Sequence, residues 1–320
     1  MTSVHVTNLT KDYALRSGLR RSTLRAVDRV SFDLVPRRTV ALVGESGSGK
    51  STIAKLLTRM EKPSAGRIDV QLDDRTPVMG SVYQRHVQMV FQDPFASLNP
   101  FHPVEHHVAR PLRIHRRTHD AASTHARVLE MLERVNLHPA EDIAARRPHE
   151  LSGGQRQRVA IARALAPGAQ VLIADEPVSM LDVSIRLGVL NLLGRLQRED
   201  NLAVLYITHD LATARHFSDE ILVLYRGRVV ERGPSDAVIL DPHHDYTKML
   251  ALAAPDPDRV GSVGREGDTA PARDGIDNSV CYDHTLGAWV PSDEAEAAAA
   301  AATASVAASA KAAAKERARA

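Results

Sequence analysis

The sequence contains a glycine-rich loop of the kind that binds phosphate groups, Gly44-Glu45-Ser46-Gly47-Ser48-Gly49-Lys50-Ser51. In such a loop the backbone N–H groups surround the phosphates, the lysine reaches the outer ones, and the last hydroxyl holds Mg²⁺. Lys50 and Ser51 have the residue types that these two tasks need, and Thr52 continues the segment helically. The alternative is a glycine-rich turn between a strand and a helix that binds no ligand.

A second candidate anion site is the pentapeptide Leu151-Ser152-Gly153-Gly154-Gln155. Ser152 can cap the helix that follows, and Gly153 and Gly154 allow a close approach of the backbone to a ligand. The positive end of the helix dipole then faces a phosphate. The alternative is an ordinary capped helix after a loop.

Two adjacent acids, Asp175 and Glu176, follow the apolar run 170–174 and precede a proline. A magnesium-bound nucleotide needs one acid to hold the ion and a separate acid to orient the attacking water or accept its proton. Asp175 suits the first task and Glu176 the second. The alternative is a solvated acidic turn after a core strand.

Three short apolar runs precede these polar groups and predict strands that are buried on both faces. They span residues 39–43 before the loop, 170–174 before the acids and 202–208 before His209. Because an open α/β sheet places ligand-contacting groups at the ends of its strands, His209 is a candidate phosphate sensor. A histidine at a strand end can instead be purely structural.

Taken together, residues 3 to 250 resemble the nucleotide-binding subunit of ATP-binding cassette (ABC) transporters, so the resemblance implies ATP and Mg²⁺ as ligands. It also implies a role for each motif, in the order of the family: the Walker A loop at 44–51, the Q-loop glutamine Gln92, the family signature at 151–155, the Walker B acid Asp175, the catalytic base Glu176, the D-loop at 179–182 and the switch His209. The implied catalytic residues are Glu176, His209 and Gln92. The implied Mg²⁺ ligands are Ser51, Gln92 and Asp175.

The resemblance also assigns Tyr13 to stacking on adenine, after a first strand at residues 4–6. Stacking of a ring on a base is worth roughly 1–3 kcal/mol. The alternative is a strand-end tyrosine that packs on the core with its hydroxyl in water. We interpret the basic run from Arg16 to Arg25 that follows as a solvated loop.

The implied fold is α/β, of the P-loop NTPase class, with an antiparallel β-layer from the N-terminal strands and an inserted helical subdomain at about 93–165. Residues 1–254 are expected to form the ABC ATP-binding domain, closed by a hairpin at 221–233 with a tight turn at Arg226-Gly227. Residues 255–320 are expected to be a linker and an alanine-rich tail that is disordered or a fraying helix.

Two segments, 91–100 and 241–248, resemble the oligopeptide and dipeptide importer branch, although Asp245 stands where that branch commonly has a proline. The implied function is ATP hydrolysis that energises an ABC importer, with peptides favoured and glycosides, nickel chelates and other solutes left open. The alternative is a soluble, non-transport ABC ATPase in a cytosolic enzyme complex, such as a carbon–phosphorus lyase assembly.

The same resemblance implies the partners. Two ATPase subunits, identical or sister chains, would form a head-to-tail dimer in which each signature helix closes on the ATP of the partner. Integral membrane permease subunits would carry the solute, and an extracytoplasmic solute-binding protein would act indirectly. The expected location is peripheral, at the cytoplasmic face of the cell membrane.

Composition agrees with this placement. The 41 Lys and Arg against 39 Asp and Glu leave a net charge of +2, too balanced to indicate a nucleic-acid partner. Cys281 is the single cysteine, which excludes an intrachain disulfide framework. No apolar stretch reaches the roughly 18 residues of a membrane span, and no signal peptide is recognisable. The histidines between 102 and 125 are interpreted as a solvated face, with a metal site as the alternative.

Overall fold

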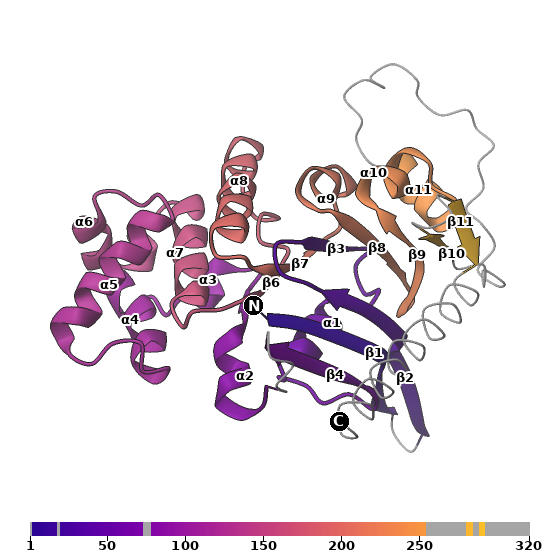
Figure 1. The fold of residues 1–320 in the computed structure, drawn as a ribbon, viewed down its shortest axis with the longest axis horizontal. Coiled ribbons are helices and arrows are strands. Elements are labelled where there is room, and N and C mark those ends of the chain that lie inside the picture. Colours follow the sequence, from indigo (N-terminus) through magenta and orange to yellow (C-terminus); the bar gives the residue numbers. More distant parts are fainter. Residues whose placement is uncertain (1, 18–19, 73–77, 254–279, 284–287, 292–320) are drawn as a thin grey trace, which may run out of the picture.

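The three apolar runs lie at the centre of an eight-stranded sheet in the computed structural model (Figure 1). The structure describes residues 2–17, 20–72, 78–253, 280–283 and 288–291. Among these residues the strand order is β11-β10-β9-β8-β3-β7-β6-β5. The strands are β3 (Thr39–Val43), β5 (Val87–Val90), β6 (Val171–Asp175), β7 (Ala203–Thr208), β8 (Glu220–Tyr225), β9 (Arg228–Pro234), β10 (Val280–Asp283) and β11 (Ala288–Pro291). Strands β3, β5, β6, β7 and β8 are parallel.

The side chains of the central strands alternate between two hydrophobic clusters, one on each face of the sheet. In β3, Ala41 and Val43 belong to one cluster, and Val40 and Leu42 belong to the other. Successive side chains of a strand point to opposite faces, so a strand covered on both faces must be apolar throughout. This requirement explains why the three runs show no polar alternation.

A second layer of three antiparallel strands, in the order β2-β1-β4, lies over one face of this sheet with α1 (Figure 1). Its elements are β1 (Thr2–Ser17), β2 (Arg20–Leu34), β4 (Ala65–Leu72) and the helix α1 (Lys50–Leu57). Val6 of β1 and Phe32 of β2 pack in the same cluster as Leu42 of β3 and Ile53 of α1. The predicted antiparallel β-layer is therefore present.

The basic run from Arg16 to Arg25 differs from the solvated loop that we expected. Its described residues lie in the ends of β1 and β2, which pair from Asp12↔Arg25 to Ser17↔Arg20. The Arg25 guanidinium donates to both carboxylate oxygens of Asp12, at 2.9 and 3.3 Å. Cross-strand pairing thus places an acid opposite the basic segment, which the charge of that segment alone does not reveal.

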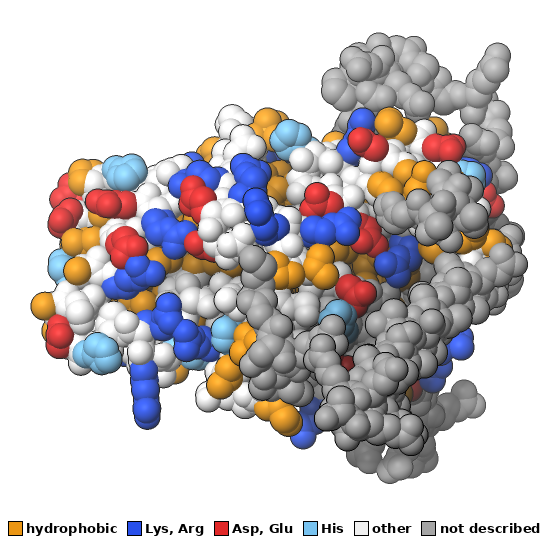
Figure 2. Space-filling model, in the orientation of Figure 1, with side chains coloured by type: hydrophobic (Ala, Val, Ile, Leu, Met, Phe, Trp, Pro, Cys, Tyr) orange, Lys and Arg blue, Asp and Glu red, His pale blue; other side chains and the backbone are white. Residues whose placement is uncertain are grey.

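Helices occupy most of residues 94–165, within the stretch of about 93–165 that we expected to be the helical subdomain. They are α3 (Pro94–Ser97), α4 (Val104–Ile114), α5 (Ala121–Arg134), α6 (Ala140–Ala145), a 3₁₀ helix (Pro148–Glu150) and α7 (Gly153–Leu165). They gather at the left end of the view in Figure 1. On the face shown in Figure 2, basic and acidic side chains are interspersed over this end.

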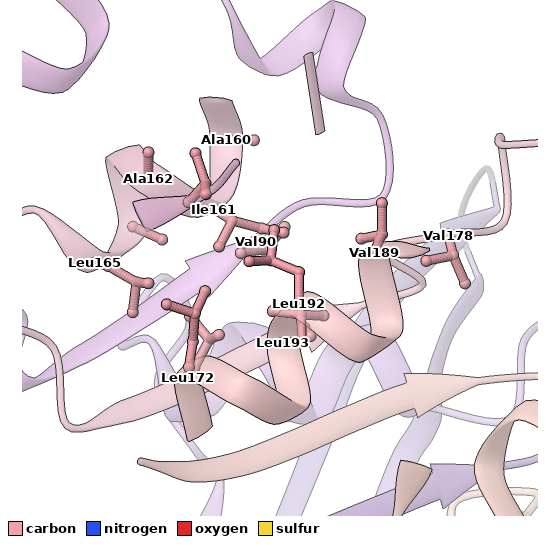
Figure 3. Close-up of a cluster of buried hydrophobic side chains, with 14 of the residues drawn as sticks. Val90, Ala160, Ile161, Ala162, Leu165, Leu172, Val178, Val189, Leu192 and Leu193 are labelled. Atoms are coloured by element: carbon pink, nitrogen blue, oxygen red, sulfur yellow. The ribbon is translucent and has the colours of Figure 1, made fainter. Parts of the chain in front are cut away.

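The helical group joins the sheet through α7 and through the helix α8 (Val183–Glu199). Figure 3 shows Ile161 and Leu165 of α7 in one cluster with Leu192 of α8, Leu172 of β6 and Val90 of β5. Burying side chains of this size stabilises the fold by about 1.5–3 kcal/mol each. The remaining helices are α2 (Gly80–His86), α9 (Leu211–Phe217), α10 (Ser235–Leu240) and α11 (Asp245–Ala253).

The predicted hairpin is formed by β8 and β9, and both residues of its Arg226-Gly227 turn have positive φ, 47° and 84°. Next to it, β10 pairs with β9 in parallel and with β11 antiparallel. The sequence did not predict these two strands within 255–320. A four-residue strand shows little hydrophobic alternation, and its formation depends on the strand with which it pairs. The expected alanine-rich tail lies outside the described residues.

Candidate functional site

One edge of the sheet carries the phosphate loop, which we define as residues 44–51, together with the acidic pair and His209. Val43 at the end of β3 pairs with Thr208 at the end of β7. Asp175 is the last residue of β6, which pairs with β7. Because the strands are parallel, the groups that follow them emerge at the same edge, as the sequence predicted.

The Lys50 ammonium is held inside the phosphate loop. It donates to the backbone carbonyls of Gly44 at 2.6 Å and Glu45 at 2.8 Å, and the residue is only 5% exposed. Burial lowers the pKa of Lys50, and the negative charges of Glu176 and Asp175 oppose this effect. The lysine is therefore bonded to the loop and lies within electrostatic range of the two acids.

The backbone of the loop leaves room for an anion. Gly47 and Gly49 have φ of 83° and 111°, a conformation that glycine adopts without strain. A Cβ on Gly49 would lie 2.3 Å from the carbonyl oxygen of Ala26, whereas one on Gly47 would meet no atom within 4 Å. No side chain among the described residues caps α1, so the N–H groups of its first turn are available to a phosphate. The loop therefore fits a phosphate ligand.

Asp175 and Ser51 form a pair of oxygen groups beside the lysine. The Asp175 side chain is buried, which raises the pKa of its carboxyl, and a hydrogen bond with Ser51 opposes that rise. A carboxylate and a hydroxyl are hard oxygen donors of the kind that Mg²⁺ prefers. These two side chains therefore fit a magnesium ion.

Glu176 is contacted by both of the other predicted catalytic residues. Its Oε2 accepts a hydrogen bond from Nε2 of Gln92 at 2.9 Å, and its Oε1 lies 3.2 Å from Nδ1 of His209. Its backbone N–H donates to the carbonyl of Ile207 at 2.9 Å, and its φ is 45°. A left-handed glutamate costs about 1–3 kcal/mol, and such strain concentrates at functional sites. The structure thus brings the three residues into one cluster.

Two aspartates that the sequence analysis did not single out cap the helices that follow Gln92 and His209. Asp93, directly after Gln92, caps α3 by accepting from the N–H of Phe95 at 2.7 Å. Asp210, directly after His209, caps α9 by accepting from the N–H of Ala212 at 2.9 Å. An aspartate just before a helix is a capping signal, so the sequence could have revealed both.

The second anion element, which we call the signature segment (151–155), begins α7. Ser152 Oγ accepts from the N–H of Gln155 at 3.3 Å, and Gln155 Oε1 accepts from the N–H of Ser152 at 2.9 Å. A Cβ on Gly154 would lie 2.7 Å from Cγ2 of Ile185 in α8. None of the hydrogen bonds recorded for the described residues joins this segment to the phosphate loop.

Tyr13 lies on β1, half-buried, with the Lys11 ammonium 4.9 Å from the centre of its ring. Lys11 is in turn held by Glu61 at 2.8 Å. One neighbour of the ring is therefore a cation rather than the hydrophobic core. The stacking of Tyr13 on adenine stays a prediction.

This arrangement of motifs is also found in known proteins. A family model described as ABC transporter matches residues 27–179. The dimeric ATP-binding cassette MJ0796, in a post-hydrolysis state bound to ADP and Pi, has a TM-score of 0.62 and 32% identity, and the match covers 72% of this chain and 98% of that one. The chain belongs to the ABC transporter family.

Two further comparisons concern the type of cassette. The cassette is 46% identical over 260 residues to the glutathione import ATP-binding protein GsiA of Escherichia coli strain K12, and equally to that of Shigella sonnei. These matches cover 79% of this chain and 41% of GsiA, so the chain spans about two fifths of the length of these curated relatives. The structure of cbiO1 from Clostridium perfringens, part of the ABC transporter complex cbiONQ, aligns with a TM-score of 0.63 at 27% identity, covering 74% of this chain and 90% of that one.

The comparisons confirm the resemblance and the fold class inferred from the sequence.

Within the described part of the cassette, every helix is too short or too polar to cross a bilayer. Of the histidines between 102 and 125, His102 and His106 stack with ring centres 4.0 Å apart, and His107 bonds the carbonyl of Asn99 at 3.0 Å. No group of three or more metal-binding side chains among the described residues is arranged to hold an ion.

Replacing Ser152 with Ala should destabilise the cassette and, under the ATPase function proposed below, also lower its ATP turnover. Loss of the cap costs about 1 kcal/mol, because the first N–H groups of α7 lose their acceptor. Asp120→Ala is the matched control, since Asp120 caps α5 with the same reciprocal pair of bonds, to Ser123. Thermal unfolding should show similar losses for both variants, and only Ser152→Ala should lower turnover. Equal turnover in the two variants would reduce the signature segment to an ordinary capped helix.

Proposed function

We propose that this chain is an ATP-hydrolysing subunit that energises an ABC importer for oligopeptides or dipeptides. The observation that carries the proposal is the cluster of Glu176, Gln92 and His209 at the same sheet edge as the phosphate loop. Glutamine, glutamate and histidine from three separate strand ends form an arrangement suited to hydrolysis, whereas a passive anion site needs only the loop.

In this proposal the phosphate loop binds the triphosphate of ATP. The N–H groups of residues 44–52 other than those of Glu45 and Ser48, which donate to Tyr246 and to the Glu45 carbonyl, would neutralise its charge together with the Lys50 ammonium. Donors at a helix N-terminus attract anions. The two carbonyls that hold Lys50 keep its ammonium beside the loop. Tyr13 would stack on the adenine.

Ser51 and Asp175, which share a hydrogen bond, would hold Mg²⁺. Gln92 would be a further ligand. When bound, the ion would neutralise charge on the phosphate oxygens and polarise the phosphorus–oxygen bond that breaks.

Glu176 would act on the attacking water as general base, and its environment suits that task. One carboxylate oxygen contacts Gln92 and the other contacts His209, so the side chain is held from two sides. The exposed His209 ring could contact the terminal phosphate and report its presence to Glu176. Water attack at that phosphate would yield ADP and inorganic phosphate, with Glu176 accepting the proton.

The signature segment would serve a second cassette, identical or a sister chain. Ser152, Gly153, Gly154 and Gln155 begin a capped helix, and Cβ atoms added to the two glycines would meet Leu181 and Ile185 rather than the loop of the same chain. A head-to-tail dimer would bring this segment to the ATP of the partner. Two ATP molecules would then hold the dimer closed until hydrolysis releases it.

The import role rests on the similarity to GsiA, whose name describes glutathione import, and glutathione is a short peptide. Residues 1–254 would form the ATP-binding domain, with its helical subdomain at about 93–165 docked on permease subunits. This docking would hold the cassette at the cytoplasmic face of a cell membrane. An extracytoplasmic solute-binding protein would deliver the peptide.

Affinity isolation of the tagged chain from its own cells in mild detergent tests this role. We expect two multi-spanning membrane proteins and a solute-binding protein, and the purified binding protein should bind di- or oligopeptides in calorimetry. Recovery of soluble enzymes alone would contradict the importer role and support the alternative, a soluble, non-transport ATPase. If the binding protein does not bind peptides, the importer role would stand and the proposed solute would be wrong.

A further inference from the structure

The segment at the start of α11 reaches back to the phosphate loop. The hydroxyl of Tyr246 accepts a hydrogen bond from the backbone N–H of Glu45 at 2.8 Å, although the two residues are 201 positions apart. Tyr246 is 1% exposed, and its ring lies against that of Tyr225, with centres 4.3 Å apart. The bond therefore joins a buried, packed side chain to the first turn of the loop.

The bonded N–H belongs to the same peptide unit as the carbonyl of Gly44. That carbonyl accepts from the Lys50 ammonium at 2.6 Å. In a trans peptide the N–H and C=O point in opposite directions, so fixing one fixes the other. The Tyr246 hydroxyl on one side thus aims the Gly44 carbonyl at Lys50 on the other.

An uncharged hydrogen-bond acceptor is favourable beside the Glu45 N–H. Burial raises the pKa of Tyr246 to about 12, so the phenol stays uncharged at neutral pH. A carboxylate in its place would also accept the N–H bond, but it would repel an anionic ligand in the loop. A phenol fixes the peptide without adding negative charge.

The two residues that lie two and three positions before Tyr246 are held by a buried acid. Glu231 is 0% exposed, and its two carboxylate oxygens accept from the N–H groups of His243 and His244, at 2.8 and 3.1 Å. His244 Nδ1 in turn accepts from the N–H of Tyr246 at 3.1 Å. The His243 ring lies against that of Trp289 in β11, with ring centres 4.8 Å apart. The residues just before Tyr246 are therefore held by Glu231 of β9 and by Trp289 of β11.

We infer that Tyr246 is a positioning residue for the ATP site, acting by fixing the Gly44–Glu45 peptide and through it Lys50. The inference rests on the proposed function of the phosphate loop. Without the hydroxyl the peptide gains freedom, and a nucleotide must order it on binding. Loss of the hydroxyl should therefore weaken ATP affinity and leave the chemical step unchanged. None of the hydrogen bonds of Tyr246 among the described residues involves Glu176, Gln92 or His209.

Tyr246→Phe in the full chain tests the inference, because it removes the hydroxyl and keeps the ring. We expect the Kd for a non-hydrolysable ATP analogue to rise about three- to tenfold, with kcat at saturating ATP within about twofold of the unaltered chain. Tyr83→Phe is the matched control, since Tyr83 is a buried tyrosine whose hydroxyl donates to the Leu57 carbonyl at 2.5 Å. The Kd of the Tyr83→Phe variant for the ATP analogue should not change.

Hydrogen exchange gives a second measurement that needs no nucleotide. Amides of the phosphate loop should exchange faster in Tyr246→Phe than in Tyr83→Phe. An unchanged Kd in Tyr246→Phe, or an equal rise in both variants, would overturn the inference, because either result assigns the hydroxyl a merely structural role. If the unaltered chain binds no ATP analogue, the proposed function fails instead.

Discussion

Glu176→Gln should retain ATP binding and lose most ATP turnover, with kcat falling by about 100- to 10,000-fold. Glutamine keeps the size of the side chain and an oxygen that can accept from Gln92, so the cluster should keep its shape. It cannot take a proton from water, which removes the proposed base. Turnover should be measured by phosphate release, and binding by titration with ATP.

The same variant should accumulate as a dimer when ATP is present, because hydrolysis no longer releases the bound subunits. Size-exclusion chromatography with and without ATP would detect the change. Glu130→Gln is a suitable control, since Glu130 is an exposed glutamate on α5 paired with Arg127, and exposed pairs contribute little. Equal turnover in Glu176→Gln and the unaltered chain would remove Glu176 from the role of base.

Lys50→Ala should weaken ATP binding itself, by about 10- to 100-fold in Kd. The ammonium lies beside the loop, and hydrogen bonds to charged groups are worth about 1.5–3 kcal/mol. Because burial of the charged ammonium carries a desolvation cost, its removal should not greatly lower thermal stability. A weakened Kd with an intact fold would therefore report on the site.

Lys55→Ala provides the comparison for Lys50→Ala. Lys55 lies on the same helix and is exposed, so its removal changes the net charge equally without altering the loop. Its Kd for ATP should stay close to that of the unaltered chain. An undiminished affinity in Lys50→Ala would count against assigning ATP to the phosphate loop.

The sequence by itself determined the parts of the site that depend on neighbouring residues. The glycines and Lys50 specify a strand, loop and helix at 39–57, because backbone freedom and side-chain type act locally. Ser152 and Gln155 specify the start of α7 in the same way, through a reciprocal pair of bonds within four residues. Continuous apolar runs indicated strands covered on both faces.

Only the tertiary structure decided which distant residues meet. The bond from Gln92 to Glu176 spans 84 positions, and the bond from Glu45 to Tyr246 spans 201. Such contacts depend on the order of the strands and on where each chain crosses the sheet, and hydrophobic periodicity carries no information about either. For the same reason the pairing of Arg25 with Asp12 and the addition of β10 to β9 were visible only in the folded chain.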